Sequence, residues 1–482
     1  MLAAISVAGA FAGALAVVPV LAFGALNACG GDPATDDGDA GDSPDAPGLP
    51  ESAPALVTKT CKTDGECTAA GNSAAKCVAV GGGQKACVAT KSCTGGDGAN
   101  SACGAVAGNE TAPGTNDCCQ TIAVPGGSFN RFNDATYPAK VSPFLLDAYE
   151  VTAGRFRAYV EATGGNLRGA APKVGDGAHP KVPNSGWRSE WNAVLPASRA
   201  DVDAMLGAPG CVEGGNIDDF GTLTWWTSDL ESKIKQANGK NASILAENTK
   251  SALDGKAINC VPWHVLMAFC IWDGGRLPTD AEWSFAVQGG PEQREFAWGS
   301  MDGKDLIHIA GRADLSQVPT LVPGTPFMTA ALYDPTLGVN DFPKNYVHDY
   351  GGPFRTTRDN ASHVARVGLR AKGNAKWGHA DMAGGMYEWT MDEGPITPGQ
   401  CNDCANVNYP ALDGFDPKAM DSTIPDFPHA LYAGGSRSVR GGAWDNSLGL
   451  SNSQSEVEIE TYTSYPVKRT YRSLGGRCAR DP

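Results

Sequence analysis

The chain has 482 residues, a formal net charge of −15 and 42% hydrophobic residues, and it contains 11 tryptophans. Phosphate binding needs concentrated lysine and arginine, so this acidic balance argues against a nucleic acid as a partner. The length allows two or three domains, and the apolar content is enough for at least one sizeable core.

The first 28 residues are almost wholly apolar and end in Leu26-Asn27-Ala28 before Cys29. This ending resembles a bacterial lipobox, in which the cysteine takes the lipid. It predicts a signal sequence over residues 1–28 and an exported, extracytoplasmic protein of the cell envelope with a lipid anchor in a membrane. An ordinary signal peptide and an uncleaved anchor are alternatives, because the run is long enough to span a bilayer. The usual basic start is missing, since the first basic residue is Lys59.

Residues 29–60 have the composition of a disordered tether. The stretch 30–58 contains seven acidic residues, no basic ones and much Gly, Pro, Ala and Ser. Such a segment cannot bury a core, and its charges repel one another. We expect it to hold the rest of the chain away from the membrane.

Residues 61–119 form a cysteine-rich segment. If Cys29 carries lipid, 14 of the 15 cysteines remain, an even number that in an exported chain indicates disulfides. The spacing C-x5-C-x9-C occurs twice and two adjacent cysteines follow, at positions Cys61, Cys67, Cys77, Cys87, Cys93, Cys103, Cys118 and Cys119. A zinc site is the alternative, but the segment has no histidine and no C-x2-C pair. We predict disulfides, whose connectivity the spacing leaves open.

From about residue 120 the sequence predicts mixed helices and strands. The stretch 124–131 is typical of a strand, and 141–165 is typical of a second strand and then a helix, which runs from a Thr152 cap to the stop at Gly164-Gly165. A second helix is expected within 258–275. A third lies within 276–290, where Thr279 and Glu282 have the spacing of a capping box and Gly289 ends the helix.

Six short motifs between residues 120 and 482 resemble, in the same order, those of the formylglycine-generating enzyme or sulfatase-modifying-factor family. They are GGSF (126–129), YEVT (149–152), RLPT with AEW (276–283), DMAGGMYEW (381–389), RGGAW (440–444) and GGRCAR (475–480). The resemblance implies an irregular α/β (α+β) fold, related to C-type lectins, with little regular secondary structure. Residues 170–255 and 300–365 match none of the motifs and are expected to be loop insertions.

The family's oxidases carry two cysteines after the late Gly-Gly pair, and their thiolates bind Cu(I). Counted from Gly442, those positions are Asn446 and Ser451 here. Cu(I) prefers sulfur ligands, and an amide and a hydroxyl cannot replace two thiolates. We therefore expect no copper and no catalytic residue at these positions, so that whether the chain is an enzyme stays open.

The same stretch is a candidate binding cleft. A groove shaped by the fold does not depend on the metal, and its lining would be Arg440, Trp444, Asp445, Asn446 and Ser451. The alternative is that Trp444 belongs to the core and that Asp445 and Asn446 form a turn.

The motif at 381–389 also matches a calcium site of the family. The resemblance assigns a side-chain oxygen to Asp381, backbone carbonyls to Gly384 and Met386, and a carboxylate to Glu388, and Ca²⁺ takes such oxygen ligands. Gly385 stands where the family usually has asparagine. The alternative is that Glu388 only pairs with a basic neighbour.

The resemblance further implies a disulfide between Cys270 and Cys478. Of the remaining cysteines after residue 120, this leaves Cys211 to pair with Cys260 and Cys401 with Cys404. The C-x2-C spacing of the last pair also fits a redox pair or half a zinc site, but no partner pair accompanies it.

Three functions are compatible with these features. The first is a non-oxidase binding or accessory module for a peptide, a glycan or another envelope component. The second is an oxidoreductase of the family that acts on protein cysteine with a different residue set. The third is a structural cell-surface protein, in which the anchor and crosslinks matter more than a cleft.

Overall fold

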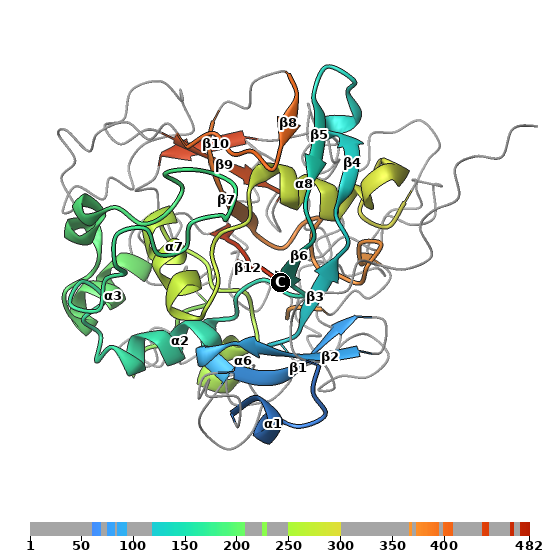
Figure 1. The fold of residues 1–482 in the computed structure, drawn as a ribbon. Coiled ribbons are helices and arrows are strands. Elements are labelled where there is room, and N and C mark those ends of the chain that lie inside the picture. Colours follow the sequence, from blue (N-terminus) through green and yellow to red (C-terminus); the bar gives the residue numbers. More distant parts are fainter. Residues whose placement is uncertain are drawn as a thin grey trace, which may run out of the picture. The chain divides into compact units, whose positions relative to one another are not determined.

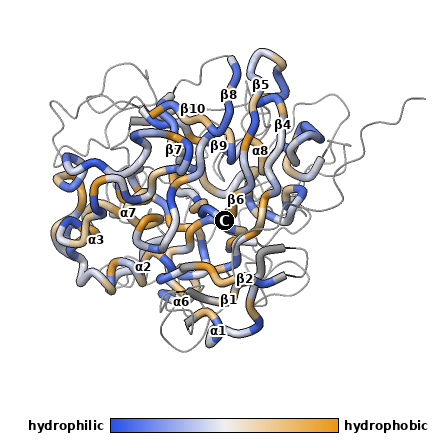
Figure 2. The backbone as a smooth tube through the Cα atoms, viewed as in Figure 1, coloured by the Kyte–Doolittle hydropathy of each residue, from blue (hydrophilic) through white to orange (hydrophobic). Residues whose placement is uncertain are grey.

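The computed structural model describes residues 60–68, 75–81, 84–93, 118–207, 224–228, 249–299, 366–368, 373–394, 399–407, 436–442, 463–466 and 473–482. The expected signal sequence, the lipidation site Cys29 and almost all of the expected tether lie outside these ranges. Within them no helix is long and apolar enough to cross a membrane. Figure 2 shows that hydrophobic and hydrophilic stretches alternate along the described elements.

The family-like region begins with four short strands in place of the two that the sequence predicts. They are β3 (Thr121–Val124), β4 (Gly127–Asn130), β5 (Pro138–Val141) and β6 (Phe144–Asp147). The single strand expected over 124–131 is wrong, because the chain turns at Gly126 with φ of 72°. A Cβ atom there would lie 2.6 Å from the carbonyl oxygen of Val141, so this close turn requires glycine.

The strands form a hairpin and three small sheets (Figure 1). The remaining strands are β1 (Ala75–Gly81), β2 (Gln84–Ala89), β7 (Tyr387–Glu393), β8 (Cys401–Asn402), β9 (Ser436–Arg440), β10 (Thr463–Pro466), β11 (Leu474–Gly475) and β12 (Ala479–Arg480). The orders are β1-β2, β10-β9-β7-β11, β12-β6-β3 and β4-β5-β8. Two sheets therefore include a strand from the last ten residues, so the C-terminus is part of the fold.

The three predicted helices are confirmed, and their caps explain their bounds. In α2 (Ala153–Ala162) the Thr152 side chain accepts a hydrogen bond from the backbone N–H of Arg155. In α8 (Asp280–Gln288) the capping box is complete, and Gly289 ends the helix in the left-handed conformation. The helix α7 (Trp263–Trp272) is almost wholly buried. The other helices are α1 (Asp64–Thr68), α3 (Arg199–Leu206), α6 (Lys250–Asp254), η1 (Lys91–Cys93), η3 (Arg131–Asn133), η4 (Ser189–Val194) and η7 (Gly290–Glu292).

The expectation that residues 170–255 form a loop insertion is wrong for its described parts. Trp187 and Trp191 are each 1% exposed and lie in one hydrophobic cluster with α2 and α7. Trp225 also belongs to that cluster and packs edge-on against Phe156. These aromatic side chains bury a large area, so the described parts that carry them belong to the main core. The stretch 300–365 lies outside the described residues.

Five disulfides crosslink the described residues: Cys61–Cys77, Cys67–Cys87, Cys93–Cys119, Cys270–Cys478 and Cys401–Cys404. The last two are the pairs named from the sequence. Cys118 and Cys260 are also disulfide-bonded, and Cys211, the expected partner of Cys260, lies outside the described residues. The fold is thus a mixed and irregular α/β structure with a disulfide-rich segment before it.

Candidate functional site

The stretch that the sequence predicts as a candidate cleft begins at Arg440, the last residue of strand β9. Arg440 is 1% exposed. Its Nη2 donates to the Ser284 hydroxyl at 2.7 Å, and its guanidinium lies over the Trp283 ring at 5.3 Å from the ring centroid. Arg440 therefore packs inward against α8. The other four cleft residues, Trp444, Asp445, Asn446 and Ser451, lie outside the described residues.

The turn after Arg440 lies against the loop that resembles a calcium site. The backbone N–H of Gly384 donates to the carbonyl oxygen of Gly441 at 2.7 Å. A Cβ atom on Gly441 would lie 3.1 Å from the carbonyl oxygen of Met382 and 3.2 Å from the Trp283 ring. The described start of the candidate cleft stretch therefore lies beside the loop at 381–389, and glycine allows the close approach.

Glu388 is fully buried near the start of β7 and forms an ion pair with Arg477. Arg477 Nε donates to its Oε2 at 2.7 Å, and Arg477 Nη2 donates to its Oε1 at 2.7 Å. Trp283 Nε1 also donates to Oε2, at 3.1 Å. Such a bidentate ion pair is geometrically specific, and both carboxylate oxygens of Glu388 already accept hydrogen bonds. The basic neighbour that the sequence left open is thus Arg477.

Two further carboxylates lie near this pair. Asp381 Oδ2 accepts from the backbone N–H of Gly368 at 2.5 Å, and Glu150 Oε1 accepts from the N–H of Met386 at 2.7 Å. Burial, with the charges of Glu388 and Asp381, raises the pKa of Glu150 well above its usual value. We call Glu150, Asp381, Glu388 and Arg477 the carboxylate cluster.

The donors of the carboxylate cluster suit Ca²⁺ in kind. Carboxylate and carbonyl oxygens are its usual ligands. The three carboxylates do not gather around one point, however. Among the described residues, the three-member group whose ligand atoms all lie within 4.8 Å of one another consists of Cys61, Cys67 and Cys87, which are in disulfides. A cation would therefore also need the carbonyl oxygens of Gly384 and Met386, and it would share Glu388 with Arg477.

A second pair of acids, Asp280 and Asp392, lies near the other end of β7. Asp392 in β7 accepts from the backbone N–H of Asp280 at 2.7 Å, and Asp280 accepts from the Ser438 hydroxyl at 3.1 Å. Burial and the charge of Asp280 raise the pKa of Asp392 to about 7. The pair therefore holds a proton near neutral pH, between β7, β9 and α8.

The described part of the chain provides no thiol for a soft metal. All twelve of its cysteines are in disulfides. Cys118 and Cys260 need partners outside the described residues, where the sequence has Cys29, Cys103 and Cys211. Three cysteines are too few to supply those two partners and also a pair of thiolates.

Sequence reasoning missed Glu150, Arg477 and the pair Asp280–Asp392 as parts of this region. Glu150 and Arg477 lie in quoted motifs, YEVT and GGRCAR, so the motifs marked the residues without their roles. Their partners are 236 and 89 positions away in the chain, and no local spacing signals such contacts.

Comparisons with known proteins agree on one family. A family model described as "Sulfatase-modifying factor enzyme 1-like domain" matches residues 107–482. A formylglycine-generating enzyme of Streptomyces coelicolor is 24% identical over 374 residues, which cover 75% of this chain and 88% of that protein. One of Thermomonospora curvata is 27% identical over 191 residues, covering 37% of this chain and 52% of that protein.

Another relative has a different name. A protein of Bos taurus called "Inactive C-alpha-formylglycine-generating enzyme 2" is 24% identical over 188 residues, covering 37% of this chain and 52% of that protein. The chain thus spans about half the length of the Thermomonospora and Bos taurus relatives. Among solved structures, PvdO from Pseudomonas aeruginosa matches with a TM-score of 0.34 and 15% identity, over 75% of this chain and 94% of PvdO.

Proposed function

Since the chain belongs to the sulfatase-modifying factor family, we propose that it is an exported, lipid-anchored member whose domain binds a ligand without oxidising it. The observation that carries the proposal is the pair Asn446 and Ser451 at the positions of the family's copper-binding thiols. The disulfides of all described cysteines support it, because a disulfide sulfur is not a thiolate ligand. The ligand class we propose is a peptide, a glycan or another envelope component.

The non-oxidase role is tested by an activity assay on the unaltered chain and by copper binding to a variant that restores the two cysteines. The purified full chain is incubated with Cu(I), dioxygen and a cysteine peptide of the sulfatase type, and the peptide is examined by mass spectrometry. We expect an unchanged peptide and no bound copper. The double variant Asn446→Cys/Ser451→Cys supplies two thiols, and we expect it to bind Cu(I). Formylglycine formed by the unaltered chain would establish the alternative, an oxidoreductase with a different residue set.

Ligand binding is tested separately. Immobilised envelope glycans and peptides are offered to the full chain and to Trp444→Ala, whose removed ring would cost contact area in a cleft. We expect binding that Trp444→Ala weakens at least tenfold. Binding that survives the substitution would move the site elsewhere. The absence of any binding, together with a normal membrane location, would favour the structural surface protein.

The anchor proposal rests on the Leu26-Asn27-Ala28-Cys29 sequence. In a bacterial host, Cys29→Ser should abolish incorporation of labelled fatty acid. The matched control is Cys103→Ser, which should leave labelling unchanged. Labelling that persists in Cys29→Ser would exclude Cys29 as the lipidated residue, and membrane retention without any lipid would indicate an uncleaved apolar anchor.

Calcium is the cofactor we propose for the carboxylate cluster, with a role in stability. Asp381, Gly384, Met386 and Glu388 would hold it, and the bound ion would supply positive charge to a buried acidic region. A ligand that binds the folded state alone raises the melting temperature, so a chelator should lower it. Asp381→Asn removes one charge and suits the positive φ of 60° there, and it should abolish the chelator effect. A melting curve that a chelator does not change in either protein would exclude the site.

A further inference from the structure

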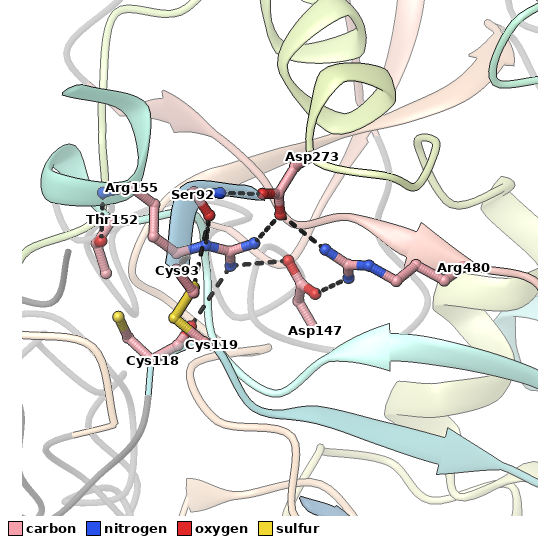
Figure 3. The surroundings of a disulfide bond; sticks show 9 residues. All are labelled: Ser92, Cys93, Cys118, Cys119, Asp147, Thr152, Arg155, Asp273 and Arg480. Carbon is pink, nitrogen blue, oxygen red and sulfur yellow. Dashed lines mark hydrogen bonds and ion pairs between the residues drawn. A yellow bond between two sulfur atoms is a disulfide. The ribbon is translucent and has the colours of Figure 1, made fainter. Parts of the chain in front are cut away.

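Four charged side chains form a second buried group, which we call the charge tetrad: Asp147, Arg155, Asp273 and Arg480 (Figure 3). Arg155 donates to Asp147 Oδ2 at 2.9 Å and to Asp273 Oδ2 at 2.7 Å. Arg480 donates to Asp273 Oδ2 at 2.8 Å and also to Asp147. The side chains are at most 3% exposed, and two positive charges face two negative ones. The tetrad joins α2, β6, β12 and the end of α7.

The tetrad is completed by a residue of the cysteine-rich segment. Ser92 lies in η1, and its backbone N–H donates to Asp273 Oδ1 at 2.6 Å. Its hydroxyl oxygen accepts from Arg155 Nε at 3.0 Å. Ser92 therefore provides hydrogen-bond partners for Asp273 Oδ1 and Arg155 Nε, which do not bond to the other tetrad residues. We call residues 91–93 the hook.

A disulfide holds the hook in place. Cys93 is bonded to Cys119, two positions before strand β3, and the two residues are 5% and 1% exposed. Arg155 Nη1 also donates to the carbonyl oxygen of Cys118 at 3.4 Å. The hook precedes residue 107, where the match to the family begins. A segment outside the family match thus completes the polar core of the family domain.

We propose that the hook and Cys93–Cys119 form a redox-sensitive clasp on the charge tetrad. With the disulfide intact, the hook excludes water from Arg155 and Asp273. Reduction by a dithiol releases the hook, hydrates the tetrad and loosens the ends of β6 and α7. The clasp thereby couples the redox state of the surroundings to the stability of the domain.

The redox step is ordinary thiol–disulfide exchange. A thiolate of the dithiol attacks one sulfur of Cys93–Cys119, and the S–S bond breaks as a mixed disulfide forms. The second thiol of the reductant then displaces the protein sulfur. The dithiol ends as a disulfide, having lost two electrons and two protons, and Cys93 and Cys119 end as two thiols. Because Cys93 and Cys119 are buried, the hook must open transiently before the reductant reaches their sulfurs. The hydrogen bonds of Ser92 oppose this opening and therefore slow the reduction of the disulfide.

Hydrogen exchange on the full chain tests the clasp with matched disulfide variants. The double variant Cys93→Ser/Cys119→Ser is compared with Cys401→Ser/Cys404→Ser, which removes a disulfide of sequence separation 3 at another place. We expect amides in 144–157 and 269–276 to exchange at least tenfold faster in the first variant and at the unaltered rate in the second. Unchanged protection of both stretches in the first variant would overturn the proposal.

A second measurement does not require the disulfide variant to fold. Ser92→Ala removes the hydroxyl that accepts from Arg155, and Ser128→Ala, at an exposed serine of β4, is its control. Each protein is treated with dithiothreitol, and alkylation with mass mapping gives the rate of reduction of Cys93–Cys119. We expect at least fivefold faster reduction in Ser92→Ala and no change in Ser128→Ala. Equal rates in both would show that the hook does not guard the disulfide.

Discussion

The charge tetrad and the carboxylate cluster differ in how they shift the pKa of a buried acid, although each takes an arginine from the C-terminal segment. Arg480 belongs to the tetrad and Arg477 to the cluster. In the tetrad, burial raises the pKa of Asp147, but Arg155 and Arg480 bring it below its usual value. In the cluster, burial and two neighbouring acids raise the pKa of Glu150 well above its own.

This difference separates a structural arrangement from a candidate site. A buried charge is tolerable when it is paired and hydrogen-bonded, as in the tetrad. Buried acids that repel one another, as Glu150, Glu388 and Asp381 do, are stabilised when a proton or a cation joins them, and strongly perturbed acids mark candidate functional sites. Of the predictions below, the second breaks the tetrad and the third removes an acid from the cluster, and the effects of these two on stability should have opposite signs.

The largest effect should come from the disulfide that holds the C-terminal segment on which both groups depend. Cys270–Cys478 spans a sequence separation of 208, and the chain-entropy model gives roughly 5 kcal/mol for a loop of this size. Removal of both cysteines as alanines should lower the free energy of unfolding by about that amount in urea titrations. The Cys401/Cys404 double variant, with its short loop, should lose much less. Equal losses would mean that loop length is not the cause.

Neutralising one tetrad acid should come next. Asp147→Asn leaves Arg155 and Arg480 with too little negative charge, and breaking a buried pair costs about 3–5 kcal/mol. The control is Glu292→Gln, because Glu292 also pairs with two basic residues but has a side chain 43% exposed. Exposed pairs contribute about 0–1 kcal/mol. Similar losses in the two variants would contradict the structural role of the tetrad.

Removing one acid from the carboxylate cluster should raise the stability of the domain, the opposite of the effect of Asp147→Asn. Glu150→Gln keeps an acceptor for the N–H of Met386 and removes the carboxyl group that the charges of Glu388 and Asp381 disfavour in its ionised form. We expect the melting temperature in the presence of a chelator to rise by roughly 2–4 °C, the shift that about 1 kcal/mol produces in a large domain. Glu161→Gln, at an exposed position of α2, should change nothing. A fall in melting temperature would show that the cluster is already balanced.

The last prediction concerns the pH dependence that the pair Asp280–Asp392 gives to stability. The folded-state pKa of Asp392 is raised from 3.8 to about 7, so the folded state holds a proton that the unfolded state has lost in this window. Its contribution to stability is complete below pH 3.8 and is lost as the pH rises through 7. Asp280→Asn removes the neighbouring charge and should shrink this fall.

That effect is measured as a difference in unfolding free energy between the unaltered chain and Asp280→Asn from pH 4 to 8. The exposed Asp134→Asn serves as the control. Carbon-13 chemical shifts of the Asp392 carboxyl give its midpoint directly, which we expect to move to lower pH in Asp280→Asn. An unmoved midpoint would mean that burial alone sets this pKa.

The sequence by itself determined the features that depend on neighbouring residues. Helix caps at Thr152 and Thr279 act within one turn, and the left-handed Gly289 ends α8, so these helices could be predicted from local spacing. The motif order identified the family for the same reason, since each motif is short and contiguous. The positions Asn446 and Ser451, on which the proposed non-oxidase function depends, are likewise read from the sequence.

Tertiary structure decided most of the pairing over long distances, apart from the Cys270–Cys478 disulfide that the family resemblance implied. It split the expected strand at Gly126, where the chain must pass close to Val141, and it brought Trp187 and Trp191 of a supposed loop into the core. It paired Glu388 with Arg477, a residue 89 positions away in the chain. Buried charges need partners, whatever their place in the chain, and the fold alone determines which partners lie within reach.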